Sequence, residues 1–381
     1  MNKSSRPFVF ISRMSEDDAV IHFWQTIVDG ALLKKASDIH IEPDSGFSHI
    51  RLRVDGHLSH LKSSPYPWHE RLASRVKILA RLDISEKRLP QDGQLQVQAS
   101  NTLQNVDCRV STLPTLHGEK IVLRILNKRP EDLNIENIGL QERQLMDLQQ
   151  AIGKPQGFIL VTGPTGSGKT QTLYSCLKHL LDGTKNISSI EDPIEIQLQG
   201  INQVQVNEKS GLSFDLALRA LLRQDPDVMM IGEIRDPQTA KTAFQAAQTG
   251  HLVLSTVHAN DAASAIGRLG QLGIHPSDIA NHVLCITAQR LLRLTCSACH
   301  QSDALLANCT HCSGTGFKGR TAVHQVMPIV PTIAHLIETN RSVNDINNEC
   351  SRLGIADLKA SAQFIVSCGQ TTLEEMNREI S

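Results

Sequence analysis

The 381-residue sequence lacks the long hydrophobic runs that a membrane protein needs. No apolar stretch approaches the ~20 residues of a transmembrane helix. The run FVFI near the N-terminus is also too short for a signal peptide. We therefore expect a cytoplasmic protein, whose contact with any membrane would be peripheral.

An excess of charge of one sign is missing as well. Lys and Arg total 38 against 39 for Asp and Glu, so the formal net charge is -1. A chain of this balance has no global attraction to DNA or to acidic lipid. Aromatic residues make up only 3% of the chain and form no strip with basic residues. This pattern counts against nucleic acid as a partner.

The cysteine usage does not indicate a disulfide framework. The nine cysteines are an odd number and are sparse for the length of the chain. Four of them form two Cys-x-x-Cys pairs, which in a reducing compartment indicate metal more than a bridge. The other five lie among apolar neighbours and are predicted to be buried thiols: Cys108, Cys176, Cys285, Cys350 and Cys368.

The first third of the chain predicts a small α+β domain over residues 15–127, after an N-terminal tail of residues 1–14. Apolar residues at helical spacing predict a helix over 20–32. Alternating patterns around an Asp55-Gly56 turn, and again in three later segments, predict strands. Those segments are 93–98, 105–110 and 119–126. The charged segment 128–140 is predicted to be a linker.

From residue 141 the pattern becomes that of an α/β domain. Short continuous apolar runs, bounded by turn residues and separated by helical segments, are typical of buried parallel strands. The clearest runs are GFILVTG at 157–163, DVMMIG at 227–232 and HLVLSTV at 251–257. The fold class is therefore α/β for residues 141–381, with helices predicted over 328–381.

The sequence GPTGSGKT fits the phosphate-loop pattern G-x-x-x-x-G-K-[ST], and it follows a strand and precedes a helix as that motif requires. Its glycines let backbone N–H groups converge on phosphate oxygens at a helix N-terminus. Lys169 is predicted to reach the terminal phosphates and Thr170 to ligate Mg²⁺. The predicted ATP-binding residues are Gly163, Pro164, Thr165, Gly166, Ser167, Gly168, Lys169 and Thr170.

Further polar residues stand at the ends of the predicted parallel strands. Glu191 and Glu233 each follow an apolar run, and we expect both to point towards the γ phosphate and the metal. His251 and His258 bracket a third strand and are candidates for sensing the γ phosphate. Arg219 and Arg223 have helical i, i+4 spacing, which fits a solvated helix face as well as a nucleotide contact.

Together these motifs resemble the type II secretion and type IV pilus assembly ATPases. The resemblance rests on GPTGSGKT, EDPIE at 191–195, LRQDPDVMMIGEIRD at 222–236 and TGHLVLSTVHAND at 249–261. In the N-terminal part it rests on ASDIHIEP at 36–43, EKRLPQDGQLQ at 86–96 and RVSTLPTLHGEKIVLRIL at 109–126.

This resemblance implies a homohexameric ATPase with a RecA-like C-terminal domain and a PAS-like N-terminal domain. By motif position, Arg109 and Arg124 would close on the phosphates, a role that suits the guanidinium fork. Glu233 is the implied water-orienting carboxylate. The implied partners are a polytopic platform protein of the inner membrane and an adaptor protein, and we expect the extra N-terminal docking domain of many relatives to be lacking.

The two cysteine pairs give the spacing C-x₂-C-x₉-C-x₂-C over residues 296–312. Four thiolates suit a closed tetrahedral zinc site, although iron–sulfur ligation fits the spacing too. The predicted ligands are Cys296, Cys299, Cys309 and Cys312.

The resemblance implies that this module marks ATPases of pilus extension or secretion, since the related retraction ATPases lack it. Two alternatives stay open at this point. One is a retraction motor of the same superfamily, and the other is a DNA translocase or conjugation motor.

Overall fold

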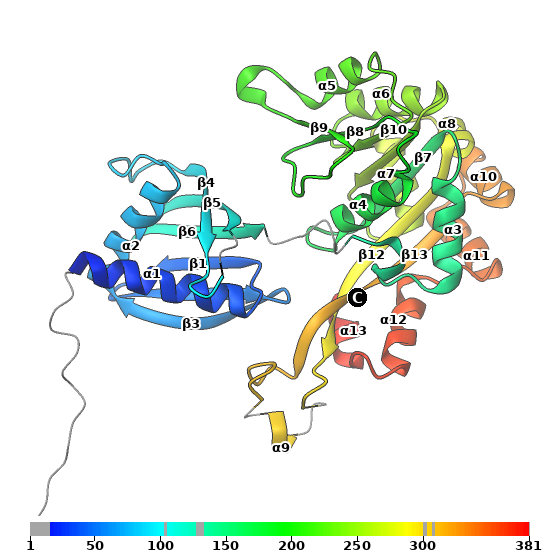
Figure 1. Cartoon of the computed structure of the whole chain (residues 1–381). Helices are drawn as coiled ribbons and strands as arrows, with labels where there is room; N and C mark the ends of the chain where they lie inside the picture. The colour runs from blue at the N-terminus through cyan, green and yellow to red at the C-terminus, as the bar shows by residue number, and fades with distance from the viewer. Residues whose placement is uncertain (1–15, 103–104, 127–132, 300–302, 307–308, 381) are drawn as a thin grey trace, which may run out of the picture. The chain divides into compact units, whose positions relative to one another are not determined.

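The computed structural model describes residues 16–102, 105–126, 133–299, 303–306 and 309–380. The predicted tail, residues 1–14, lies outside this range. The chain divides into two compact units, Met1–Lys128 and Arg129–Ser381. Each unit is described by itself below, with the elements labelled as in Figure 1.

The N-terminal unit is one antiparallel sheet in the order β3-β2-β1-β6-β5-β4, with two helices on one face. Its elements are α1 (Glu16–Leu33), β1 (Asp38–Pro43), β2 (Phe47–Val54), β3 (His57–Pro65), α2 (Tyr66–Leu79), β4 (Gln91–Gln98), β5 (Asn105–Thr115) and β6 (Gly118–Leu126). Alternation along β1 buries Ile39 and Ile41 beneath the helices. The intervening polar residues, such as Asp38, lie on the opposite face. The predicted helix and strands of this region are confirmed.

The C-terminal unit is a seven-stranded sheet in the order β13-β12-β7-β11-β10-β8-β9. All neighbours are parallel except β12 and β13, which form an antiparallel pair. Its strands are β7 (Gly157–Thr162), β8 (Ile187–Glu191), β9 (Asn202–Gln205), β10 (Val228–Ile231), β11 (Leu252–Val257), β12 (Val283–Thr295) and β13 (Phe317–Pro328). The three parallel strands predicted from continuous apolar runs are confirmed as β7, β10 and β11.

Helices cover both faces of this sheet, so every residue of β7 is buried. Phe158 and Leu160 face one core, and Ile159 and Val161 face the other. The α-helices are α3 (Glu142–Ile152), α4 (Lys169–Leu180), α5 (Phe214–Leu221), α6 (Pro237–Gln248), α7 (Ala262–Gln271), α8 (Pro276–His282), α9 (Asp303–Leu306), α10 (Pro331–Glu338), α11 (Val343–Arg352), α12 (Leu358–Ser367) and α13 (Leu373–Glu379). Because a core lies on each face of the sheet, strands such as β7 and β10 show continuous apolar runs instead of an apolar–polar alternation.

Part of the segment predicted as a linker, 128–140, belongs to this packing. Residues 128–132 lie outside the described range. Leu133, Ile135 and Ile138 are buried in the core that also contains β7 and α4. The short 3₁₀ helix η2 (Ile135–Asn137) ties this stretch to the C-terminal unit. The linker prediction followed the charged residues of this segment and missed its three buried apolar residues.

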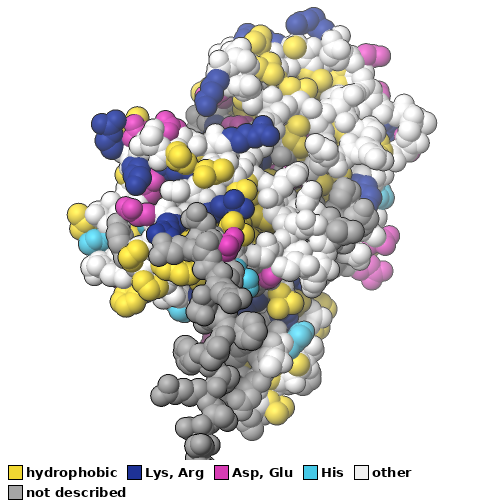
Figure 2. All heavy atoms as spheres, turned by 60° about the vertical axis from the view of Figure 1, so that its left-hand side comes forward, with side chains coloured by type: hydrophobic (Ala, Val, Ile, Leu, Met, Phe, Trp, Pro, Cys, Tyr) yellow, Lys and Arg dark blue, Asp and Glu magenta, His cyan; other side chains and the backbone are white. Residues whose placement is uncertain are grey.

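The surface carries mixed charge. On the face in view in Figure 2, Lys and Arg side chains are interspersed with Asp, Glu and apolar side chains. Within the described ranges, none of the helices combines the length and the apolarity required to cross a bilayer.

Candidate active site

The phosphate loop connects the end of β7 to the start of α4. Gly163 and Gly168 have φ values of +147° and +91°, which residues with a Cβ rarely adopt. The side chain of Lys169 folds back over the loop, and its Nζ donates to the carbonyls of Gly163 at 2.9 Å and Pro164 at 3.0 Å. Burial lowers the pKa of Lys169, an effect that the nearby charge of Glu233 opposes. The loop therefore holds an ammonium group at a helix N-terminus, which is a suitable site for a phosphate group.

Glu233 and His258 lie together at the same edge of the sheet. The sheet order β7-β11-β10 places the end of β11 between the phosphate loop and the end of β10. His258 follows β11, and its Nε2 lies 3.7 Å from Oε2 of Glu233. Glu233 also forms an ion pair with Arg235. The structure thus brings Lys169, Glu233 and His258 into one electrostatic cluster.

Glu191 has a different environment from Glu233. It ends β8, is only 3% exposed, and accepts hydrogen bonds at both carboxylate oxygens. The Tyr174 hydroxyl donates to Oε2, while Ser189 and Gln203 donate to Oε1 at 2.6 and 3.1 Å. The carboxylate therefore faces helix α4 and its neighbours. The expectation that Glu191 points towards the γ phosphate and the metal stays a prediction; what the structure shows is that protein donors hold both of its oxygens.

Tyr174 was not identified by the sequence motifs, although it lies one helical turn after Thr170. It is fully buried, and its oxygen also accepts from the backbone N–H of Glu195 at 3.3 Å. Burial and the negative charge of Glu191 raise the pKa of Tyr174, so its hydroxyl keeps the proton that it donates. Tyr174 links the phosphate-loop helix to the EDPIE segment.

The structure does not bring His251 to the phosphate loop. His251 precedes β11, and its Nδ1 lies 2.9 Å from the carbonyl oxygen of Ala246 at the end of α6. Its own carbonyl accepts from Gly157, which begins β7. Seven residue steps along a strand separate His251 from His258, or roughly 20 Å. The two histidines therefore lie at opposite edges of the sheet.

Arg219 and Arg223 extend from the end of α5. Arg219 forms an ion pair with Asp215 and is half exposed. Arg223 donates to the backbone carbonyl of Arg219 at 2.9 Å. These contacts fit the reading of a solvated, ion-paired helix end.

Arg109 and Arg124 lie directly opposite each other on strands β5 and β6 of the N-terminal unit. The Nε of Arg124 donates to Asp38 on β1 at 3.1 Å, but 65% of its side chain is exposed. Like charges in directly opposed positions repel unless an anion lies close by. Two facing cations attract a negatively charged group, and Asp38 is such a group for Arg124.

Two further residues of the site come from β12, and sequence motifs did not identify them. Gln289 lies behind the phosphate loop and is almost fully buried. Arg290 donates to the carbonyl of Asn260 at 2.9 Å, close enough to Lys169 for its charge to lower the pKa of that lysine further. The only signal in the sequence was a polar pair, Gln289-Arg290, that interrupts an apolar strand.

The four predicted cysteine ligands form one cluster beyond the ends of β12 and β13, with all four sulfur atoms within 4.8 Å of one another. The Sγ atoms of Cys296 and Cys309 are 3.8 Å apart, as are those of Cys299 and Cys312. Zn–S bonds of about 2.3 Å in a tetrahedral site require S–S distances of about 3.8 Å. The geometry of the thiols therefore fits a zinc ion.

The surroundings of the cluster favour thiolates. Burial opposes ionisation of Cys296, but hydrogen bonds from His311 and from backbone N–H groups outweigh it and lower the pKa of this thiol to about 6. The Gly316 N–H lies 3.3 Å from the Cys312 sulfur. Of the five remaining cysteines, four are buried as predicted, but Cys368 is exposed at the end of α12.

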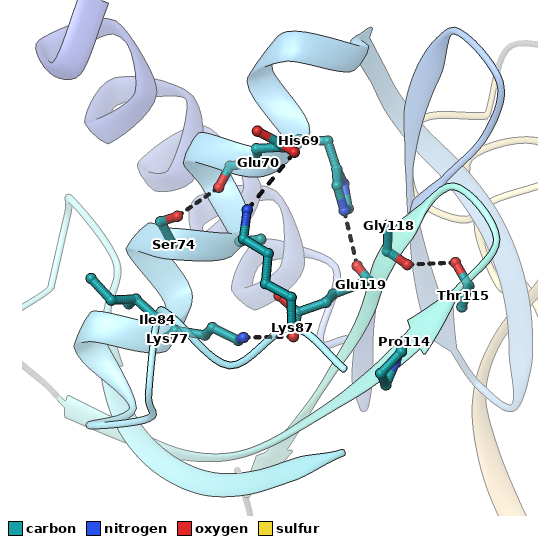
Figure 3. Close-up of a pocket in the computed structure, with 11 residues that line it drawn as sticks. His69, Glu70, Ser74, Lys77, Ile84, Lys87, Pro114, Thr115, Gly118 and Glu119 are labelled. Carbon is teal, nitrogen blue, oxygen red and sulfur yellow. Dashed lines mark hydrogen bonds and ion pairs between the residues drawn. The ribbon is translucent and has the colours of Figure 1, made fainter. Parts of the chain in front are cut away.

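A separate cleft of about 80 Å³ lies in the N-terminal unit between α2 and the β5–β6 hairpin (Figure 3). A buried ion pair forms part of its lining, with Lys77 Nζ 2.6 Å from Glu119 Oε1. Its volume is far below the ~300 Å³ of a small-molecule pocket. None of the predicted site residues lines this cleft.

Comparison with known proteins gives one family model, described as "Type II/IV secretion system protein", which matches residues 13–378. The chain is 44% identical over 362 residues to the type II secretion system protein HxcR of Pseudomonas aeruginosa, covering 94% of the chain and 77% of the relative. It is 41% identical over 393 residues to the type IV pilus assembly ATPase PilB of Acinetobacter baylyi, covering 97% and 68%.

Solved structures share the fold. The pilus retraction motor PilT with bound ADP matches with a TM-score of 0.64 and 26% identity, over 93% of this chain and 96% of that one. The Legionella pneumophila ATPase DotB matches with a TM-score of 0.73 and 20% identity, over 94% and 95%. At that identity the second match shows the fold alone.

Proposed function

This chain belongs to the family of type II/IV secretion system proteins, and from that membership we propose that it is an ATPase motor that drives pilin or pseudopilin polymerisation. The observation that carries the proposal is a complete phosphate loop at the end of β7 with Glu233 and His258 at the same sheet edge. Relatives named as a pilus assembly ATPase and a secretion system protein support the same activity.

ATP would bind at residues Gly163–Thr170. Backbone N–H groups of the loop and the ammonium group of Lys169 would hold its β and γ phosphates, once Lys169 leaves the carbonyls of Gly163 and Pro164. The Thr170 hydroxyl at the start of α4 offers an oxygen ligand for Mg²⁺. A bound Mg²⁺ would neutralise the charge that develops on the phosphates.

Glu233 is our candidate for orienting the attacking water. It lies two residues after β10, is partly exposed, and has His258 and Arg235 as neighbours. Its carboxylate oxygens can accept a hydrogen bond from a water molecule. Glu191 accepts hydrogen bonds from three protein donors, so we assign it to positioning the EDPIE segment through Tyr174.

We propose that the cysteine cluster binds a structural zinc ion, which takes no part in ATP hydrolysis. The sulfur separations of 3.8 Å and the donors around Cys296 and Cys312 support zinc. Four thiolates leave no open coordination position, so the ion would supply stability and no reaction step. The module also favours extension or secretion over retraction, because the retraction ATPases of this superfamily lack it.

The assembly that we propose is a ring of six copies at the cytoplasmic side of the inner membrane. The relatives' roles in secretion and pilus assembly support a polytopic platform protein as the partner, with an adaptor protein as a further contact. Arg109 and Arg124 of a PAS-like N-terminal domain would complete the ATP site. Their directly opposed positions on neighbouring strands, with the Arg124 side chain exposed, support this role.

The proposed function is tested by Glu233→Gln and Lys169→Ala in the full chain. Glu233→Gln should bind ATP within about threefold of wild type but lose at least ~100-fold in kcat, because an amide cannot accept the water proton. Lys169→Ala should lose ATP binding. The measurements are phosphate release and the dissociation constant of a fluorescent nucleotide.

Arg378→Ala serves as the control, since Arg378 is exposed at the C-terminal helix and pairs only locally with Glu375 and Glu379 in the described chain. It should turn over ATP at the wild-type rate. A Glu233→Gln protein that hydrolyses ATP as fast as the control would refute the water-orienting role.

A further inference from the structure

Gln289 occupies a position behind the phosphate loop that no motif assigns. Strand β12 pairs with β7 up to Ala288 and Thr162, so Gln289 stands beside Gly163, where the loop begins. A Cβ on Gly163 would lie 2.5 Å from the Gln289 carbonyl oxygen. The loop therefore passes directly against β12, and Gln289 is only 2% exposed.

The side-chain amide of Gln289 makes two short hydrogen bonds. Its Nε2 donates to the Ser167 carbonyl at 2.7 Å, and its Oε1 accepts from the Thr172 hydroxyl at 2.7 Å. A backbone carbonyl can only accept, so the orientation of the amide is fixed by its partners. Gln289 thereby ties the loop to the first turn of helix α4.

This contact sets the direction of one peptide group in the loop. In a trans peptide the C=O and N–H bonds point to opposite sides. Because the Ser167 carbonyl points at Gln289, the N–H of Gly168 points away from β12. Gly168 itself, at φ +91°, has no Cβ to restrict rotation of that peptide, so its direction depends on an external partner.

We propose that Gln289 is a positioning residue of the phosphate loop, which holds the Ser167–Gly168 peptide with its N–H directed at the bound phosphate. The proposal rests on the proposed function, in which this loop binds the phosphates of ATP. Gln289 contacts the loop and not the nucleotide. Its removal should weaken nucleotide binding while leaving the chemical step intact.

The test is Gln289→Met in the full chain, which keeps the length of the side chain but removes the donor. Without this donor the Gly168 N–H would lose its hydrogen bond to the phosphate. The loss of one hydrogen bond to a charged group corresponds to about a 10- to 100-fold rise in the dissociation constant of fluorescent ADP. KM for ATP should rise by the same factor, with kcat within about threefold of wild type. A role confined to stability would lower kcat and the folded fraction instead.

Gln144→Met is the matched control. Gln144 is also buried, and its Nε2 donates to a backbone carbonyl, that of His324, at 2.7 Å and to a serine hydroxyl. It lies on α3, away from the loop, so ADP affinity should be unchanged. Wild-type ADP affinity in Gln289→Met, or an equal loss in Gln144→Met, would overturn the proposal.

Two additions keep every outcome decisive. If Gln289→Met does not fold, Thr172→Val is the second variant, which removes only the hydroxyl that donates to the Gln289 amide. A loss of ADP affinity of at least threefold in Thr172→Val supports the proposal, and no loss overturns it. Lys169→Ala separates the two hypotheses. If it abolishes binding while Gln289→Met does not, only the positioning role fails; if it binds ADP normally, the phosphate site itself is wrong.

Discussion

Tyr174 and Glu191 form a buried donor–acceptor pair between helix α4 and the end of β8. Nearly all of the carboxylate's hydrogen-bonding capacity is used inside the protein, by Tyr174, Ser189 and Gln203. A buried carboxylate that loses a donor is left with an unsatisfied oxygen, which costs about 1–3 kcal/mol. The pair therefore fixes the EDPIE segment relative to the phosphate-loop helix.

We predict that Tyr174→Phe lowers kcat for ATP by about 10-fold or more while ADP affinity stays within about threefold. The ring is retained, so packing is preserved and only the hydroxyl is lost. Phosphate release and ADP titration measure the two quantities. The double variant with Glu191→Gln should be no worse than the worse single variant, because the two residues act as one unit.

Ser175→Ala is the control for this prediction. Ser175 lies next to Tyr174 on the same helix, and its buried hydroxyl has no hydrogen-bond partner in the part of the chain that is described. Its removal should change neither turnover nor affinity. Additive losses in the double variant would contradict the coupling between Tyr174 and Glu191.

At the scale of elements, the β12–β13 pair forms an arm that extends from the sheet towards α9 and the cysteine cluster (Figure 1). The segment of the C-terminal helices contacts this arm at its far end, close to the cysteine cluster. Arg293 on β12 donates to the buried Glu375 of α13 through Nε and Nη2, and its guanidinium lies 4.0 Å over the Phe317 ring. The Thr295 N–H donates to the Gln370 carbonyl at 2.9 Å. The cysteine cluster thus lies on a strand pair that is anchored independently of any metal.

We predict one zinc per chain, lost on Cys309→Ser, with unfolding confined to the module at 296–316. Metal-binding energy stabilises this module, whose core among the described residues consists of the cysteines and Leu306. The two large cores of the C-terminal unit do not depend on it. Elemental analysis and limited proteolysis test the two parts of the prediction.

Thiol reactivity sharpens this test. In the zinc-bound protein only the exposed Cys368 should react rapidly, because the other thiols are buried or would ligate the metal. Chelation should release up to four more. Cys368→Ser is the matched control: it should retain zinc and lose the rapid phase. Five rapid thiols before chelation would contradict a bound metal.

At the scale of the whole molecule, the proposed reaction requires both units. The phosphate loop belongs to Arg129–Ser381, whereas Arg109 and Arg124 belong to Met1–Lys128. Arginines that stabilise a phosphoryl transition state affect turnover far more than ground-state binding. Movement of one unit against the other during hydrolysis would couple ATP turnover to work on the platform protein.

We predict that Arg109→Ala and Arg124→Ala each lower kcat by at least about 100-fold, with ATP affinity changed by less than about threefold. Lys120→Ala is the control, because Lys120 is on the same strand as Arg124 but its charge is paired with Glu42 at 2.8 Å. Single-turnover kinetics and nucleotide titration measure the effect. An equal loss of binding and turnover would argue against the arginine clamp.

The sequence by itself determined the α/β class, the buried strands, the phosphate loop and the cysteine set. Each of these is a local pattern: consecutive apolar residues for a strand buried on both faces, glycines and Lys169 within eight residues, and cysteines in close pairs. Charged residues concealed one part of the packing, since Leu133, Ile135 and Ile138 reach the core from a segment predicted to be a linker.

Only the tertiary structure decided what each polar side chain contacts. Glu191 and Glu233 both follow apolar runs. Glu191 accepts a hydrogen bond from Tyr174, whereas Glu233 lies close enough to Lys169 to influence its pKa. His251 is separated from the site because it precedes β11, whereas the phosphate loop and His258 lie at the opposite, carboxyl ends of the strands. Gln289 and Ser167 are 122 residues apart in the chain and meet because β12 pairs with β7. Such contacts depend on strand order and register, which local sequence patterns do not specify.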